Sequence, residues 1–261
     1  MTEFATSKDG TRIGYELHGE GPAVILVGGA MQFRGFDPTT TEMSKLLAEK
    51  GFAVLNYDRR GRGESADASS FTLQDEIDDL ATLIGVAGGT AALYGSSSGG
   101  AISLAAAAAG LPVTKLALWE VPLRDELGTD GAEFFAGLRE RIESGDKAGT
   151  IEYFMKDMPP EWLAGAKNSP GWPIMLELGP SLSADSESLA WTQSAPRAEL
   201  WSGITQPTIA IVGEQTVPIM PPAAESIAAN IPSARKTTIP GANHGWEPAV
   251  MADALATFLA E

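Results

Sequence analysis

The sequence contains no cysteine and only two histidines among its 261 residues. Without cysteine the chain forms no disulfide and no thiolate metal site. His18 and His244 are too few for a histidine-rich metal site, so we expect no bound metal. Basic residues are also scarce, with 18 Lys and Arg against 34 Asp and Glu and a formal net charge of −16. Because so acidic a surface repels phosphate backbones and anionic lipids, we expect neither nucleic acid nor a membrane as a partner.

Long hydrophobic runs are lacking as well. No uncharged apolar stretch reaches the ~18 residues of a membrane span. The first ten residues lack the basic and apolar regions of a secretion signal, so we expect a cytoplasmic protein. The hydrophobic content of 44% and charged content of 20% are typical of a globular protein. The length suits one large α/β domain, or a core with an insertion.

Short apolar runs with the pattern of strands buried on both faces recur along the chain. They lie at residues 23–27, 52–57, 90–94, 113–119 and 207–213, and a further strand is expected at 236–239. Helical patterns lie between or after them, at 43–50, 72–83, 101–109, 223–230 and 248–260. Two further strands, 3–7 and 11–17, flank an Asp-Gly turn that favours an antiparallel hairpin. The alternation predicts an α/β fold with a doubly wound, mostly parallel sheet, whose ligands bind at the carboxyl ends of the strands.

Residues 123–200 interrupt this alternation. They contain no buried strand pattern, but they have helical stretches at 133–143 and 150–158 and many aromatic and methionine residues. We interpret them as a helical cap inserted into a core of residues 1–122 and 201–261. Such side chains either line an acyl-sized pocket or form the cap's own core, and we expect the second role for more than half of them.

A Gly-x-Ser-x-Gly motif with Ser97 at its centre joins the strand at 90–94 to the helix at 101–109. A sharp strand-to-helix turn pushes the central side chain outward, towards a substrate. The motif is weak by itself in a chain with 29 glycines, so the strand–turn–helix context carries the inference. A serine needs a base, and His244 follows the strand at 236–239, although a capping or core histidine is the alternative. We interpret His18 as a surface or turn residue.

Two further motifs have competing interpretations. Gly28-Gly29 follows an apolar strand but lacks the spacing of a phosphate loop, so we expect no nucleotide and no other cofactor. The three arginines at 59, 60 and 62 suggest either an anion site or a tight turn whose arginines pair with carboxylates. We favour the tight turn.

The chain resembles the α/β-hydrolases with a serine nucleophile. The resemblance is carried by Gly28-Gly29, the turn at 58–65, the motif at 95–99 and the segment 241–244, and it covers the chain apart from the cap. It implies an ester, thioester or lactone substrate, although members also include C–C hydrolases and cofactor-free haloperoxidases. Where many members have His-Gly this chain has Gly28-Gly29, which still provides backbone for an oxyanion hole. That hole is expected from the N–H groups of Ser98 and Ala30, with Met31 as an alternative to Ala30.

The acid of the expected catalytic triad departs from the family pattern. Members usually have an Asp three residues after the glycine that ends the strand at 207–213, where this chain has Thr216. Some members, including a group of haloalkane dehalogenases, have the acid after the strand that follows the nucleophile helix, and Glu120 occupies that place. A carboxylate there fixes the imidazole tautomer and stabilises the imidazolium. We assign Glu120 as the acid, with Glu214 as its competitor and a dyad without an acid also open.

These residues predict a Ser-His-Glu hydrolase acting through an acyl-enzyme. His244 deprotonates Ser97, which attacks the carbonyl of a small to medium apolar acyl compound. The alternatives are a non-hydrolytic relative, either haloperoxidase-like or cyclising, and a catalytically inactive ligand-binding member. The expected partner is a small-molecule substrate, and a homodimer is left open.

Overall fold

An eight-stranded sheet lies at the centre of the computed structural model, which describes residues 1–65 and 68–261. The strands are β1 (Glu3–Thr6), β2 (Arg12–His18), β3 (Ala23–Val27), β4 (Ala53–Tyr57), β5 (Ala91–Ser96), β6 (Val113–Trp119), β7 (Thr208–Gln215) and β8 (Ala234–Ala242). Their spatial order is β1-β2-β4-β3-β5-β6-β7-β8. Only the pairings of β2 with β1 and β4 are antiparallel in the part described. The predicted doubly wound, mostly parallel sheet is confirmed.

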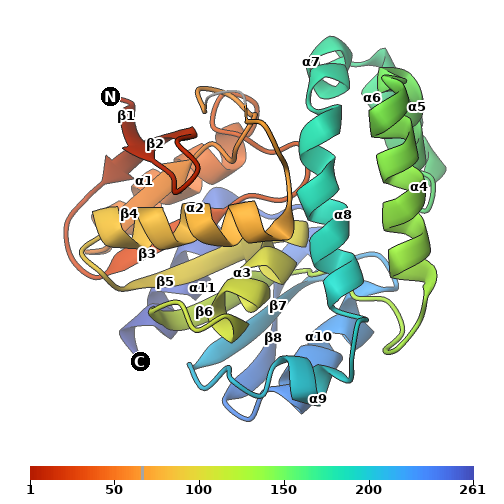
Figure 1. Ribbon diagram of the computed structural model, residues 1–261. Coiled ribbons are helices and arrows are strands. Elements are labelled where there is room, and N and C mark those ends of the chain that lie inside the picture. The colour runs from red at the N-terminus through yellow and green to blue at the C-terminus, as the bar shows by residue number, and fades with distance from the viewer. Residues whose placement is uncertain (66–67) are drawn as a thin grey trace.

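Helices cover both faces of this sheet (Figure 1). The covering helices are α1 (Pro38–Glu49), α2 (Leu73–Val86), α3 (Ser98–Ala108), α10 (Met220–Asn230) and α11 (Pro248–Ala260). One hydrophobic cluster joins α2, α3 and α10 to one face, and another joins α1 and α11 to the opposite face. All six residues of β5 are buried, as expected for a strand covered on both sides.

Several element boundaries differ from the predicted ones. The helix predicted at 43–50 begins at Pro38, because the Asp37 side chain accepts a hydrogen bond from the Thr40 N–H at 3.0 Å and caps it. The helix predicted at 101–109 begins at Ser98, directly after the turn. The helix predicted at 150–158 ends at Phe154.

The segment between β6 and β7 consists of helices and loops throughout its length. The helices are α4 (Asp130–Ser144), α5 (Lys147–Phe154), α6 (Pro160–Asn168), α7 (Trp172–Glu177), a 3-10 turn η1 (Gly179–Ser181), α8 (Leu182–Trp191) and α9 (Arg197–Leu200). In Figure 1, α8 lies between the sheet-covering helices and α4, and it packs against α2, α3 and α4. A third hydrophobic cluster holds α4, α5 and α8 together around Leu138, Ile151 and Leu182. We call α4–α8 the inserted helices.

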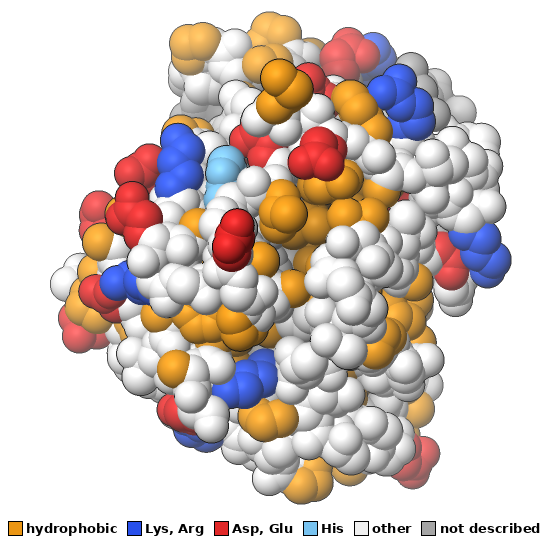
Figure 2. All heavy atoms as spheres, turned by 90° about the vertical axis from the view of Figure 1, so that its left-hand side faces the viewer, with side chains coloured by type: hydrophobic (Ala, Val, Ile, Leu, Met, Phe, Trp, Pro, Cys, Tyr) orange, Lys and Arg blue, Asp and Glu red, His pale blue; other side chains and the backbone are white. Residues whose placement is uncertain are grey.

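The outer surface mixes charged and apolar groups. On the face shown in Figure 2, acidic and basic side chains lie interspersed among hydrophobic ones rather than in one basic patch. Within residues 1–65 and 68–261, none of the helices is both long enough and apolar enough to span a bilayer.

Candidate active site

The predicted site residues follow the carboxyl ends of neighbouring parallel strands. Ser96 of β5 pairs with Trp119 of β6, so Ser97 and Glu120 come next on adjacent strands at the same level. The loop 28–32, which follows β3 on the other side of β5, ends at the same edge. The topology therefore brings the predicted nucleophile, the predicted acid and the predicted oxyanion loop to the same edge of the sheet.

Ser97 occupies the tight turn between β5 and α3, with φ 55° and ψ −124°. Glycines on both sides allow the close backbone contacts that this turn needs. A Cβ on Gly99 would lie 2.3 Å from the Val27 carbonyl oxygen, and one on Gly95 would lie 2.5 Å from the Gly100 Cα. The Gly-x-Ser-x-Gly spacing thus has a steric cause, and it leaves Ser97 on the wall of a pocket.

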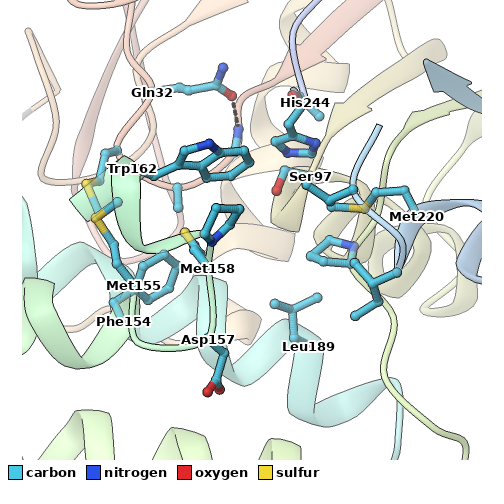
Figure 3. Close-up of a pocket in the computed structure, with 18 of the residues that line it drawn as sticks. Gln32, Ser97, Phe154, Met155, Asp157, Met158, Trp162, Leu189, Met220 and His244 are labelled. Atoms are coloured by element: carbon cyan, nitrogen blue, oxygen red, sulfur yellow. Dashed lines mark hydrogen bonds between the residues drawn. The ribbon is translucent and has the colours of Figure 1, made fainter. Parts of the chain in front are cut away.

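His244 lies beside Ser97 on the wall of the pocket (Figure 3). Its Nδ1 is 2.5 Å from Oε2 of Glu120, and the Gly213 N–H donates to Oε1 of the same carboxylate at 2.9 Å. Burial alone would raise the pKa of Glu120, but hydrogen bonds from His244 and Gly213, with the nearby Thr216 hydroxyl, lower it below its usual value. The lowered pKa favours the ionised form of Glu120, and Nδ1 is the ring nitrogen of His244 that contacts it.

The alternative residues for the acid and the base lie in different surroundings from Glu120 and His244. Glu214 is exposed near the end of β7, and its side chain makes no hydrogen bond to the described part of the chain. Thr216, where the family usually has an Asp, has a buried hydroxyl close to Glu120. His18 ends β2 beside Glu16, and it is not among the residues around the pocket. Of the two carboxylates considered, the one in contact with His244 is Glu120.

Two tryptophans that the sequence analysis did not single out contact His244. The Trp119 indole N–H donates to the His244 carbonyl at 3.3 Å, and the Asn243 N–H donates to the Gln215 carbonyl at 2.9 Å. From α6, the Trp162 ring stacks on the imidazole with 6.3 Å between centroids and 23° between planes. The position of Trp119 directly before Glu120 could have indicated its place near His244. Nothing in the sequence around Trp162 indicates that it stacks on His244.

The N–H groups of the two predicted oxyanion donors have no hydrogen-bond acceptor in the described part of the protein. Within residues 1–65 and 68–261, the N–H groups of Ala30 and Ser98 donate to no protein acceptor, and neither does that of Met31. The Gly29 N–H, in contrast, donates to the side-chain oxygen of Gln32. Ala30 and Met31 both line the pocket, so both assignments for the loop donor stay predictions.

The three arginines of the turn after β4 are almost completely buried, each no more than 1% exposed. Each pairs with a buried carboxylate: Arg59 with Glu76 at 2.7 Å, Arg60 with Asp79 at 2.7 Å and Arg62 with Asp185 at 2.5 Å. The favoured interpretation, a tight turn with paired arginines, is what the structure contains. Asp185 comes from α8 of the insertion, so the sequence did not identify it as a partner.

The pocket above Ser97 has a volume of about 1060 Å³ and opens between the sheet edge and the inserted helices. Its walls include many of the apolar side chains noted in the insertion: Phe134, Phe154, Met155, Met158, Trp162 and Met175. The same six side chains also belong to the cluster that holds the inserted helices together. One group of side chains therefore both packs the insertion and lines the pocket (Figure 3). No group of three His, Asp or Glu side chains suited to a metal ion occurs in the described residues.

Comparisons with known proteins agree on one family. A family model described as "Alpha/beta hydrolase family" matches residues 17–258. An alpha/beta hydrolase from Sphaerobacter thermophilus is 33% identical in sequence, with a TM-score of 0.84, 98% of this chain covered and 100% of that chain. An esterase from Thermogutta terrifontis (22% identity, TM-score 0.71, coverage 100% and 97%) and a bromoperoxidase from Bacillus anthracis (20%, 0.71, 100% and 100%) share the fold. A comparison with curated proteins gives no match.

Proposed function

The chain belongs to the alpha/beta hydrolase family, and from this premise we propose that it is a serine hydrolase. Its substrate is an ester, thioester or lactone of a small to medium apolar acyl compound. The observation that carries the proposal is the buried Glu120 carboxylate, 2.5 Å from Nδ1 of His244, with Ser97 beside them at the base of an apolar pocket.

In the proposed mechanism Glu120 fixes the tautomer of His244, so that Nε2 takes the proton of the Ser97 hydroxyl. The serine oxygen attacks the substrate carbonyl, and the N–H groups of Ala30 and Ser98 bind the oxyanion. His244 then protonates the leaving alcohol or thiol. A water molecule, deprotonated by the same imidazole, releases the acid and restores the serine.

The pocket supports an apolar acyl group as the substrate. Six aromatic and methionine side chains of the inserted helices face it, and flexible methionines accommodate acyl chains of different shapes. We propose that residues 123–200 act as a cap over a core formed by 1–122 and 201–261. In this arrangement the cap selects the substrate and the core performs the chemistry.

One observation favours a different class of function. Thr216 stands where family members usually have the triad acid, which is consistent with a ligand-binding member that has lost turnover. The contact between Glu120 and His244 supports an active enzyme instead, because a second carboxylate replaces the missing one. The two functions differ in one measurable property, the reactivity of Ser97.

The first experiment treats the protein with a fluorophosphonate probe and measures the intact mass. We expect one adduct on the wild type, one on Ser96→Ala and none on Ser97→Ala. Ser96→Ala is the matched control, since Ser96 is adjacent and also lines the pocket. No adduct on the wild type, combined with no turnover of p-nitrophenyl acetate to octanoate, would overturn the proposal in favour of a binding protein.

A further inference from the structure

The carboxylate of Asp185 on α8 has an exposed fraction of 0% and three charged or polar donors around it. Arg59 donates from Nη1 at 2.6 Å and Arg62 from Nη2 at 2.5 Å. The Ser98 hydroxyl donates at 2.6 Å to the same oxygen that Arg59 contacts. All three partners belong to segments around the nucleophile, whereas Asp185 itself comes from the insertion. One buried carboxylate therefore joins α8 to the catalytic edge of the sheet.

Both arginines extend this contact to the glycine loop. Nη1 of Arg59, which binds Asp185, also reaches the Gly28 carbonyl at 3.3 Å. Nη1 of Arg62 donates to the Gly29 carbonyl at 2.7 Å. The loop carbonyls thus point towards the buried ion pairs and away from the pocket.

The orientation of these carbonyls decides the orientation of the oxyanion donor. A trans peptide is planar, so the C=O of Gly29 and the N–H of Ala30 share one plane and point in opposite directions. By holding the Gly29 oxygen, Arg62 turns the Ala30 N–H away from the ion pairs. In this orientation the Ala30 N–H has no protein acceptor among the described residues. In the preceding peptide, Arg59 holds the Gly28 oxygen and the opposite N–H donates to Gln32. Both peptide planes are therefore fixed.

The second oxyanion donor has a contact with the same carboxylate. Ser98 is the first residue of α3, and its N–H is the other predicted donor. Its side chain is 2% exposed and donates to Asp185. The hydroxyl thus anchors the residue that carries the amide. Preorganised donors of this kind contribute strongly to transition-state stabilisation, because they need no reorientation when charge develops.

We infer that Asp185 is a positioning residue of the oxyanion hole, which acts by holding Arg59 and Arg62 on the glycine loop and Ser98 at the nucleophile turn. This inference rests on the proposed function. It assigns α8 a second role besides forming the pocket wall, because the insertion supplies the charge that orients both donors.

A second buried ion pair in the chain provides a matched control. Asp79 is also 0% exposed, accepts two hydrogen bonds from Arg60 at 2.7 and 2.8 Å, and accepts one from the Ser7 hydroxyl. It therefore has the same partner types as Asp185. Arg60 donates onward to Asp9 and to the carbonyls of Ser70 and Asp75, none of which is in the glycine loop. Loss of this pair removes a buried ionic contact without touching the oxyanion donors.

The test compares Asp185→Asn with Asp79→Asn on a p-nitrophenyl ester. We expect both variants to lower the urea midpoint. Asp185→Asn should also lower kcat about 10- to 100-fold with KM within about threefold, since loss of one oxyanion donor typically costs kcat 10²–10³-fold. Asp79→Asn should keep kcat within about twofold. A trifluoromethyl ketone, whose adduct bears an oxyanion, should lose affinity for Asp185→Asn by the same factor as kcat/KM, and an unreactive methyl ketone should not.

Equal kcat values for the two variants would overturn the inference while leaving the proposed function intact. If the fluorophosphonate probe does not label the wild type, the proposed function itself is overturned. If Asp185→Asn does not fold, Ser98→Ala replaces it, because it removes one hydroxyl and keeps both buried charges paired. We expect this variant to lower kcat about 3- to 10-fold at unchanged KM, with ketone affinity falling in parallel. An unchanged kcat would again overturn the inference.

Discussion

Backbone strain is concentrated at the residues of the proposed site. Six non-glycine residues have a positive φ in the described part of the chain, and five of them are residues of the proposed site or of its loops: Met31, Ser97, Glu120, Asn243 and His244. Each such conformation costs about 1–3 kcal/mol and persists only where neighbouring contacts enforce it. The enforcing contacts are the strand pairings and the hydrogen bonds to Glu120 and to the histidine loop. The positive φ values thus lower the stability of the fold, and they place the residues of the proposed site.

The strain at Ser97 leads to a prediction about stability. Ser97→Gly removes the Cβ that disfavours φ 55°, whereas Ser97→Ala keeps it. Both variants should be inactive, and Ser97→Gly should be more stable than Ser97→Ala by about 1 kcal/mol. Urea denaturation of both variants measures the difference.

Ser103, in the middle of α3, is the matched control for this prediction. There the order should reverse, with Ser103→Gly less stable than Ser103→Ala by about 1 kcal/mol, because glycine loses more entropy in a helix interior. The strain argument is wrong if glycine is the less stable substitution at both positions.

The position of the acid leads to a second prediction. Glu120→Gln should lower kcat by about 10²–10⁴-fold, because the imidazole loses the anion that orients it and stabilises its charge. The Thr216 side chain, directly after β7, lies close to this carboxylate. The double variant Glu120→Gln/Thr216→Asp should have a kcat at least about tenfold higher than that of Glu120→Gln. The new carboxylate would return an anion to His244 from the neighbouring strand end. Steady-state kinetics of the single and double variants measure both effects.

Glu214→Gln is the control for the acid, since Glu214 is exposed near the same strand end. Its kcat should stay within about twofold of the wild type, in the range expected for a surface substitution. Activity that survives in Glu120→Gln but disappears in Glu214→Gln would transfer the role of the acid to Glu214.

At the scale of elements, local pattern predicted the strands and the start of α11 at Pro248, whereas the starts of α1, α3 and α10 lie a few residues before the predicted ones. The run at 23–27 predicts β3 to the residue, because a parallel strand buried on both faces is apolar at every position. The start of α1 was missed, because the apolar periodicity begins only at Met43, whereas the helix begins earlier, after the Asp37 cap and with Pro38 at its first position. The Gly-x-Ser-x-Gly turn at 95–99 was recognised because its glycines are needed for steric reasons within five residues of sequence.

Contacts between distant segments could not be read from the sequence. Glu120 is the exception, because it was assigned from the resemblance to members whose acid follows the strand after the nucleophile helix, and it directly follows β6, the neighbour of β5. Asp185 lies 123 residues from Arg62, on a helix of the insertion whose local pattern gives no sign of a buried ion pair. Trp162 approaches His244 in the same way, from a helix without a buried residue. Such contacts depend on how the inserted helices pack on the core, which short-range patterns do not encode.

The β1–β2 hairpin provides a prediction about pH. Asp9 in its turn accepts hydrogen bonds from the Thr11 N–H at 2.9 Å and from Arg60 at 3.1 Å. The Thr11 N–H is the main cause that lowers the pKa of Asp9 from 3.8 to about 2. A carboxylate with a lowered native pKa stabilises the fold above its unfolded pKa, and this stabilisation is lost as the pH falls towards the native pKa.

Asp9→Asn should therefore cost about 1 kcal/mol at pH 7, a value reduced for the partial exposure of the side chain. The cost should shrink as the pH falls below about 4. Urea midpoints of the wild type and variant at pH 7, 5, 4 and 3.5 measure it. Asp253→Asn, at a surface pair with Lys50, is the control and should change stability by less than about 0.5 kcal/mol at every pH. A cost for Asp9→Asn that grows on acidification would contradict the assigned shift.

At the scale of the whole molecule, the net charge of −16 affects which substrates reach the pocket. The summed field of an acidic protein repels anions and leaves neutral molecules unaffected, and salt screens it over a Debye length of about 10 Å at 0.1 M. Charged groups at the pocket do not reverse this field. Arg124, which lines it, pairs with Asp130 at 2.9 Å and with Asp157 at 2.8 Å, so its charge is already compensated.

Two esters of similar size, p-nitrophenyl butyrate and the hemiester p-nitrophenyl succinate, make this effect measurable. Between 10 mM and 500 mM NaCl, kcat/KM for the anionic hemiester should rise about three- to tenfold, because screening removes the repulsion that slows its entry. The value for the neutral butyrate should change by less than about 1.5-fold, which controls for effects of salt on the enzyme itself. A kcat/KM for the hemiester that falls with salt would mean that Arg124 attracts anions more strongly than the rest of the molecule repels them. In that case Arg124→Gln should abolish the salt dependence, and the preferred acyl group would carry a negative charge rather than being wholly apolar.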